Sequence, residues 1–219
     1  MRPRDRILDA AMLVFRRHGF RRSSIEQAAE AAGLTRQALY HHFKSKEALF
    51  RAVIERIHDG ALAAEIAEVR AREKAGSGLA DILVAGLTAR LEQFIASFDG
   101  SPHVEELFSE HLLHARDLYQ KYAARYTAQD AATIERICRK QGLALARGVT
   151  VAKLARCVEM AINGAKTANP GMLPAAAFLA DVDIMVRTLV GGAVAPPRPS
   201  TRSPAKKSAR PRPKRGDRK

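Results

Sequence analysis

The sequence predicts an all-α protein, and three observations carry this prediction. Apolar residues recur three or four positions apart along most of the chain, which is the spacing of helix faces. No convincing strand pattern of alternating apolar and polar residues appears. Residues 24–43 form a short helix, a glycine turn and a second short helix, which is the helix-turn-helix arrangement. We therefore expect an N-terminal three-helix head (residues 1–57), a fourth helix that joins it to an α-helical body (residues 58–194), and a disordered basic tail (residues 195–219).

The first helix is expected over about residues 4–18. Its apolar positions fall on one stripe: Ile7, Ala11, Val14 and Phe15. Acidic residues interrupt this segment and no small-residue cleavage site follows it. We therefore interpret it as the first helix of the fold and not as a targeting peptide.

The helix-turn-helix stretch carries its own start and stop signals. Ser24 and Gln27 are spaced as the two partners of a capping box. Gly33 ends the helix because only glycine adopts the left-handed C′ conformation without steric cost. Thr35 can cap the next helix. This pattern predicts that residues 35–41 enter the major groove of DNA.

The formal net charge of +14 is distributed unevenly. Residues 1–50 hold ten Lys and Arg against five Asp and Glu, and residues 51–195 hold seventeen of each. Residues 196–219 hold ten Lys and Arg against Asp217 alone. A neutral middle with two basic ends predicts a polyanionic partner for the ends.

The tail has six of the ten prolines and no large apolar side chain within residues 196–219. Such a segment cannot bury enough surface to offset the entropy of ordering, so we expect it to be disordered. Two interpretations stay open: a solubilising tail, or a non-specific DNA clamp whose affinity falls steeply with salt. We favour the clamp slightly, because the head would act on the same polyanion.

The remaining helices are expected over about residues 45–73, 79–98, 103–118, 119–141, 150–164 and 174–190.

Cys138 and Cys157 are too few for a disulfide framework, and no apolar run is long enough to cross a membrane. We therefore expect a cytoplasmic protein. Walker, dinucleotide and serine-hydrolase motifs are absent, so we expect neither an enzyme nor a cofactor.

One polar cluster lies outside the head. His103, Glu106, Glu110 and His114 fall on a narrow stripe of the helix expected at 103–118. The apolar residues of this helix lie on another face: Val104, Phe108, Leu112 and Ala115. A polar stripe away from the apolar face is usually solvated, so a metal-dependent enzyme built on this cluster is the least favoured alternative.

The run from Gly19 to Phe50, G-F-x-x-x-S-I-x-x-A-A-x-A-A-G-L-T-R-x-A-L-Y-H-H-F-K-S-K-E-A-L-F, resembles the DNA-binding head of TetR/AcrR-family transcriptional regulators. The resemblance covers about residues 4–57, and the body shares only helix number and length. It implies a ligand-responsive repressor that binds a near-palindromic double-stranded operator as a homodimer through its last two helices. It also implies a small-molecule effector that rotates the two heads apart. A sequence-tolerant architectural protein driven by the tail is the main alternative.

Site residues follow from chemistry together with this resemblance. Arg36 can pair with a guanine and Gln37 with an adenine, beside Thr35 at the start of the recognition helix. The candidate phosphate contacts are Ser24, Tyr40, His41, Lys44 and Lys46. The candidate effector pocket, with simple core packing as its alternative, consists of Phe94, Phe98, Tyr119, Tyr122 and Tyr126.

Overall fold

The computed structural model describes residues 3–98 and 100–195, and the predicted tail segment 196–219 lies outside them. The described part forms nine helices: α1 (Pro3–His18), α2 (Ile25–Ala31), α3 (Arg36–His42), α4 (Lys46–Lys74), α5 (Leu79–Ala96), α6 (Val104–His114), α7 (Arg116–Gln141), α8 (Val151–Ala168) and α9 (Ala175–Ala193). An isolated antiparallel bridge joins Leu145 and Val194. The all-α prediction is confirmed. None of the helices described is long and apolar enough to cross a membrane.

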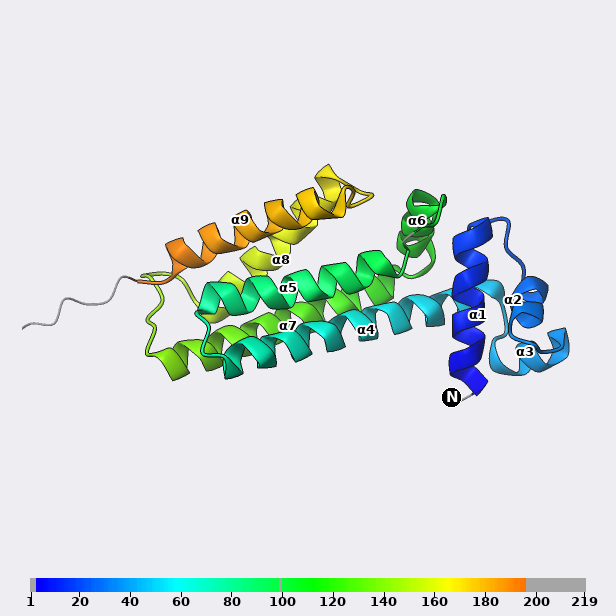
Figure 1. The fold of residues 1–219 in the computed structure, drawn as a ribbon, viewed down its shortest axis with the longest axis horizontal. Helices are drawn as coiled ribbons and strands as arrows, with labels where there is room; N and C mark the ends of the chain where they lie inside the picture. The colour runs from blue at the N-terminus through cyan, green and yellow to red at the C-terminus, as the bar shows by residue number, and fades with distance from the viewer. Residues whose placement is uncertain (1–2, 99, 196–219) are drawn as a thin grey trace, which may run out of the picture.

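The molecule is elongated, with α1–α3 at one end and the body helices at the other (Figure 1). Three phenylalanines hold the head together. Phe20 lies 4.7 Å from Phe50 and 5.9 Å from Phe15, and Phe15 meets Phe50 edge-on at 5.2 Å, measured between ring centroids. Because Phe50 belongs to α4, this cluster attaches the head helices to the connecting helix.

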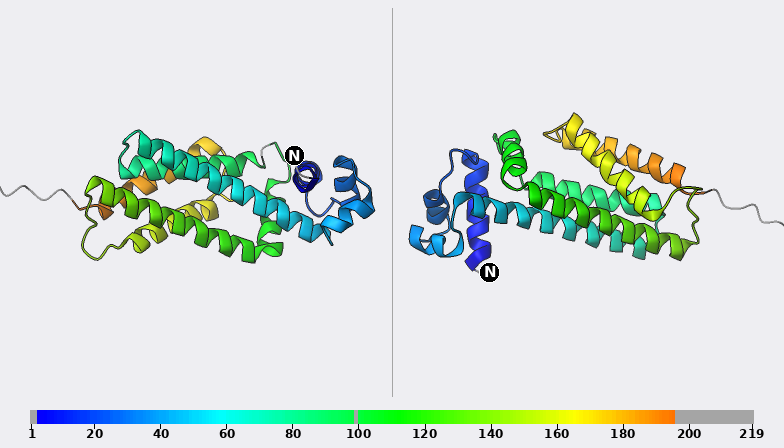
Figure 2. Two further views of the ribbon diagram at one scale, coloured as in Figure 1. Left: turned by 90° about the horizontal axis from the view of Figure 1, so that it is seen from below. Right: turned by 180° about the vertical axis from the view of Figure 1, so that it is seen from behind.

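The connecting helix α4 runs without a break from the head along the body (Figure 2). The Ser45 hydroxyl caps it by accepting a hydrogen bond from the Ala48 N–H at 3.1 Å. In the body it packs closely on α5 at Gly86, where a methyl group would lie 2.6 Å from a Val69 methyl carbon. The head and the body are therefore linked by one continuous helix.

Two predicted helix ends are wrong. The helix expected at 103–118 breaks at Ala115, which gives a short α6 and a longer α7. Arg51 of α4 holds this break, since it donates to the His114 carbonyl at 2.6 Å and to the Asp117 carboxylate at 2.6 and 2.7 Å. Helix α8 continues past Gly164 to Ala168, because an interior glycine weakens a helix by only about 1 kcal/mol.

The core of the body contains a buried charge cluster. Arg90 of α5 donates to Glu159 of α8 at 2.6 Å and to Glu65 of α4 at 3.2 Å. Asp130 of α7 is also buried, and its Oδ2 atom has no hydrogen-bond partner. Burial raises the pKa of Asp130 well above its usual value, and the neighbouring Glu65 carboxylate adds to this shift. Arg90 therefore pairs with carboxylates from two helices, α4 and α8, while burial favours the uncharged form of Asp130.

We expect Arg90→Met to lower the free energy of unfolding by about 3–5 kcal/mol, because it leaves buried carboxylates without a counter-ion. Urea unfolding followed by circular dichroism measures this loss. The matched control is Arg72→Met, since Arg72 pairs with Glu68 at 2.7 Å on the exposed surface and contributes little there. Equal effects of the two substitutions would contradict a stabilising role for the buried cluster.

Candidate DNA-binding surface and ligand cavity

The helix-turn-helix has the local structure that its sequence predicts. The Ser24 hydroxyl accepts a hydrogen bond from the Gln27 N–H at 3.3 Å, and the Gln27 side chain accepts one from the Ser24 N–H at 2.9 Å. Gly33 has a left-handed φ of +65°. The Thr35 hydroxyl accepts from the Ala38 N–H at 3.2 Å, which starts α3 at Arg36. The predicted capping box, glycine turn and second cap are confirmed.

The three candidate base-reading residues lie together at the start of α3. Thr35, Arg36 and Gln37 are all exposed. The Arg36 Nε atom lies 2.8 Å from a Glu26 carboxylate oxygen, and its guanidinium lies 5.4 Å from the centroid of the Tyr40 ring. Both members of the ion pair are solvated, so the pair contributes little free energy. Arg36 can therefore leave Glu26 for another partner, such as a base, at little energetic cost.

The candidate phosphate contacts divide into two groups. His41 and Lys44 are exposed, whereas Tyr40 is half-buried and packs against the core. The Ser24 N–H, which we expected to face a phosphate, is already bound by Gln27 in the capping box. The Ser24 hydroxyl is engaged as well, since it accepts from the Gln27 N–H and interacts with the Glu26 carboxylate.

The Lys46 side chain does not make the phosphate contact that we predicted for it. Its ammonium group donates to three backbone carbonyls of the loop between α1 and α2: Phe20 at 3.0 Å, Arg21 at 3.3 Å and Ser23 at 3.1 Å. It also lies 4.5 Å from the centroid of the Phe20 ring. Because all three of its N–H groups are used, Lys46 holds the head together and is not placed to bind a phosphate.

We expect Lys46→Met to lower the free energy of unfolding by about 2 kcal/mol, because the three carbonyls lose a charged donor. Thermal and urea unfolding measure this change. Lys44→Met, which removes an exposed lysine two residues away, is the control and should leave stability unchanged. A loss no larger than that of the control would contradict this assignment.

The predicted polar stripe of α6 does not face solvent. Glu110 is only 3% exposed and accepts a hydrogen bond from the Arg21 side chain at 2.6 Å. Glu106 accepts one from the Arg21 backbone N–H at 2.8 Å. The His114 ring packs on Phe20 with 4.9 Å between centroids. The prediction was wrong because this stripe of α6 is an interface with the head.

The same region gives no support to the metal-site alternative. In residues 3–98 and 100–195, no three His, Cys, Asp or Glu side chains are arranged to hold a metal ion. The expected apolar face of α6 also differs, since Val104 and Phe108 are half-buried whereas Leu107 and His111 are buried. Helix α6 therefore has two occupied faces, one toward the head and one toward the body.

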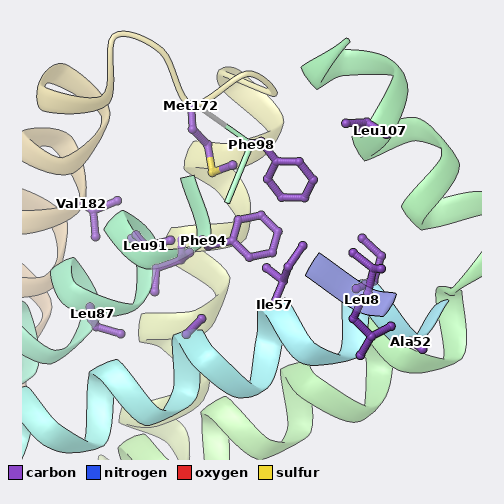
Figure 3. Packing of buried hydrophobic residues seen from close by; sticks show 14 of the residues in the cluster. Leu8, Ala52, Ile57, Leu87, Leu91, Phe94, Phe98, Leu107, Met172 and Val182 are labelled. Carbon is purple, nitrogen blue, oxygen red and sulfur yellow. The ribbon is translucent and has the colours of Figure 1, made fainter. Parts of the chain in front are cut away.

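A cavity of about 350 Å³ lies where α6 meets the body. Its wall consists of His58, Phe94, Phe108, His111, Tyr119, Asn163, Lys166, Thr167, Pro170 and Met172. Figure 3 shows the Phe94 and Phe98 rings side by side, with Met172 close by. Surface hollows of about 550 and 710 Å³ also occur, and charged side chains such as Arg72 and Arg17 line them.

The cavity includes two of the five predicted aromatic residues, Phe94 and Tyr119. The prediction was wrong for the other three. Phe98 packs behind Phe94, Tyr122 donates its hydroxyl to Asp59 at 2.6 Å, and the Tyr126 hydroxyl pairs with His58 Nδ1 at 2.8 Å. Both tyrosines face α4 because α7 packs on α4 as well as on α8.

Sequence reasoning missed the polar residues of the cavity. Burial lowers the pKa of His58 to about 2 and that of His111 to about 4, so both rings are neutral at pH 7. Lys166 is half-buried, and burial lowers its pKa to about 8. The sequence signal for them is a polar residue at the spacing of an apolar stripe, since His58 lies three and four residues before the buried Ala61 and Leu62.

Comparison with known proteins agrees with this geometry. The model for "Bacterial regulatory proteins, tetR family" matches residues 7–53. The HTH-type transcriptional repressor ComR of Escherichia coli is 41% identical over 83 residues, which are 37% of this chain and 40% of ComR. The match thus spans less than half of ComR. The repressor Rv1474c of Mycobacterium tuberculosis is 26% identical over 74% of this chain and 79% of its own length.

The solved structure of SmeT, the repressor of a Stenotrophomonas maltophilia multidrug efflux pump, has the same fold. It is 22% identical, with a TM-score of 0.59 over 88% of this chain and 90% of SmeT. The matched segment, residues 7–53, contains α2, α3 and the three candidate base-reading residues. Residues 7–53 are therefore similar to the TetR family of bacterial regulatory proteins, and the chain shares the fold of SmeT.

Proposed function

We propose that the protein is a cytoplasmic, ligand-responsive transcriptional regulator that represses by binding a near-palindromic DNA operator as a homodimer. The observation that carries the proposal is the exposed row Thr35, Arg36 and Gln37 at the capped start of α3. Residues there can reach base edges when a recognition helix lies in the major groove. ComR and Rv1474c, to which this chain is similar, are named as transcriptional repressors.

The outer faces of α8 and α9 support a homodimer. Met160 of α8 is 59% exposed and Ile184 of α9 is 63% exposed, whereas Val182 and Val186 of α9 are buried in the body. A mainly apolar hollow of about 360 Å³ also lies between these helices, with Leu189 in its wall. A second copy of this pair would cover both features in a four-helix bundle. The division into a head of residues 1–57 and a body of residues 58–194 is part of the same proposal.

The position of α6 supports ligand response. Phe108 and His111 of α6 line the cavity, and Glu110 of the same helix holds Arg21 of the head. A molecule that binds the cavity only when α6 lies in one of two positions would shift the populations of the head orientations that go with them. SmeT, which shares the fold, has been solved in complex with triclosan.

A sequence-tolerant architectural protein is the second candidate, and the basic residues 196–219 favour it. Competition separates the two. We expect the full chain, and a chain that ends at Ala195, to keep a selected duplex at 0.2 M salt against a hundredfold excess of random duplex. An architectural protein would lose the duplex to the competitor, and most of its affinity would disappear with the tail.

A further inference from the structure

The cavity beside α6 contains an unmatched positive charge. The Lys166 ammonium lies 5.5 Å from the centroid of the Phe94 ring. Within the described residues it has no carboxylate at ion-pair distance. Glu159, two helical turns earlier on α8, is bound by Arg90 at 2.6 Å. A half-buried ammonium in a mainly apolar wall, without a counter-ion, favours an anion from outside.

The rest of the cavity wall is uncharged at neutral pH. The His58 and His111 rings, 3.5 Å apart at their Nε2 atoms, are both neutral. The Asn163 side-chain oxygen accepts a hydrogen bond from the Tyr119 hydroxyl at 3.0 Å, which leaves its NH₂ group to donate. The rings of Phe94 and Phe108 are stacked, with 17° between their planes and 5.8 Å between centroids.

We propose that this cavity binds an organic anion, a carboxylate on a compact apolar body, with Lys166 as its counter-ion. The carboxylate would lie at Lys166 and the Asn163 NH₂ group, and the apolar body would lie against Phe94, Phe108 and Met172. A volume of about 350 Å³ suits a molecule of one or two rings. The inference rests on the proposed function in one respect, since it names the chemical class of the effector.

The test compares acids with their uncharged amides by calorimetric titration of the full chain. The probes are benzoate, 2-naphthoate and octanoate, each paired with its amide. We expect at least one acid to bind tenfold or more tightly than its amide, because only the acid can pair with Lys166. An acid and amide of equal affinity in all three pairs, or no binding of any acid at 1 mM, would overturn the proposal.

Two variants of Lys166 assign the preference to its charge. Lys166→Met should reduce the acid–amide ratio to less than twofold, and Lys166→Arg should keep it. The matched control Lys74→Met removes an exposed lysine at the end of α4 and should leave the ratio unchanged. Thermal unfolding of each variant confirms that it is folded. A folded Lys166→Met protein that keeps the full preference would overturn the assignment.

Failure of this inference is distinguishable from failure of the proposed function. Selection of DNA is performed without any carboxylate, and titration of carboxylates is performed without DNA. A selected operator together with no acid preference would overturn the inference alone. An acid preference that depends on Lys166, together with no selected operator, would overturn the regulator proposal alone.

Discussion

Arg36→Ala is expected to lose operator preference while weak binding to random DNA remains. The Arg36 guanidinium is exposed at the start of α3, and Glu26 holds it only through a solvated ion pair. A bidentate contact between arginine and guanine gives roughly 10- to 100-fold discrimination per half-site. Two half-sites on a dimer multiply this to about 10²- to 10⁴-fold. Fluorescence anisotropy with a selected and a random duplex measures the ratio.

The control for Arg36→Ala is Arg22→Ala, which removes the same charge from another exposed position of the head. We expect this variant to bind both duplexes somewhat more weakly and to keep the ratio of the two affinities. A positive charge that interacts only with phosphates contributes equally to the binding of every sequence. If Arg36→Ala retained the full ratio, Arg36 would not read bases. If both variants lost it equally, bulk charge would explain the preference.

Ile184→Asp is expected to convert the proposed dimer to monomers and to lower operator affinity by about a hundredfold or more. In a two-fold symmetric interface each substitution appears twice, so two carboxylates would be buried in an apolar contact. A monomer engages one half-site and loses the joint binding of two linked heads. Light scattering after size-exclusion chromatography gives the oligomeric state, and anisotropy gives the affinity.

Leu113→Asp provides the matched control for the dimer prediction. Leu113 is 71% exposed on α6, outside the pair α8 and α9, so this variant should remain dimeric and bind the operator normally. A dimeric Ile184→Asp protein would show that another surface joins the two copies. Loss of dimers in both variants would indicate general destabilisation.

The parts of the head that local chemistry determines could be predicted from the sequence. Ser24 and Gln27 are three residues apart, and Gly33 needs only its own left-handed conformation. The role of Lys46 could not be predicted in this way. Its carbonyl partners lie 23 to 26 residues earlier in the chain, in a loop whose position depends on tertiary packing.

The errors in the body have the same physical origin. The break between α6 and α7 depends on Arg51, which lies 63 residues before His114. Helical spacing places Tyr119, Tyr122 and Tyr126 on related faces, but it does not show which neighbouring helix each side chain meets. Tyr119 contacts Asn163 of α8, whereas the other two contact α4. Sequence periodicity therefore shows that these tyrosines pack inside the body, but it does not show which of them line the cavity.

In the proposed function, α3 reads a two-fold symmetric DNA sequence. Selection of bound duplexes from random DNA, with the full chain and with the chain that ends at Ala195, tests it most directly. We expect one inverted-repeat motif from both proteins, with its half-sites about one helical turn or more apart. The absence of any motif, or a motif that disappears when the tail is removed, would contradict it.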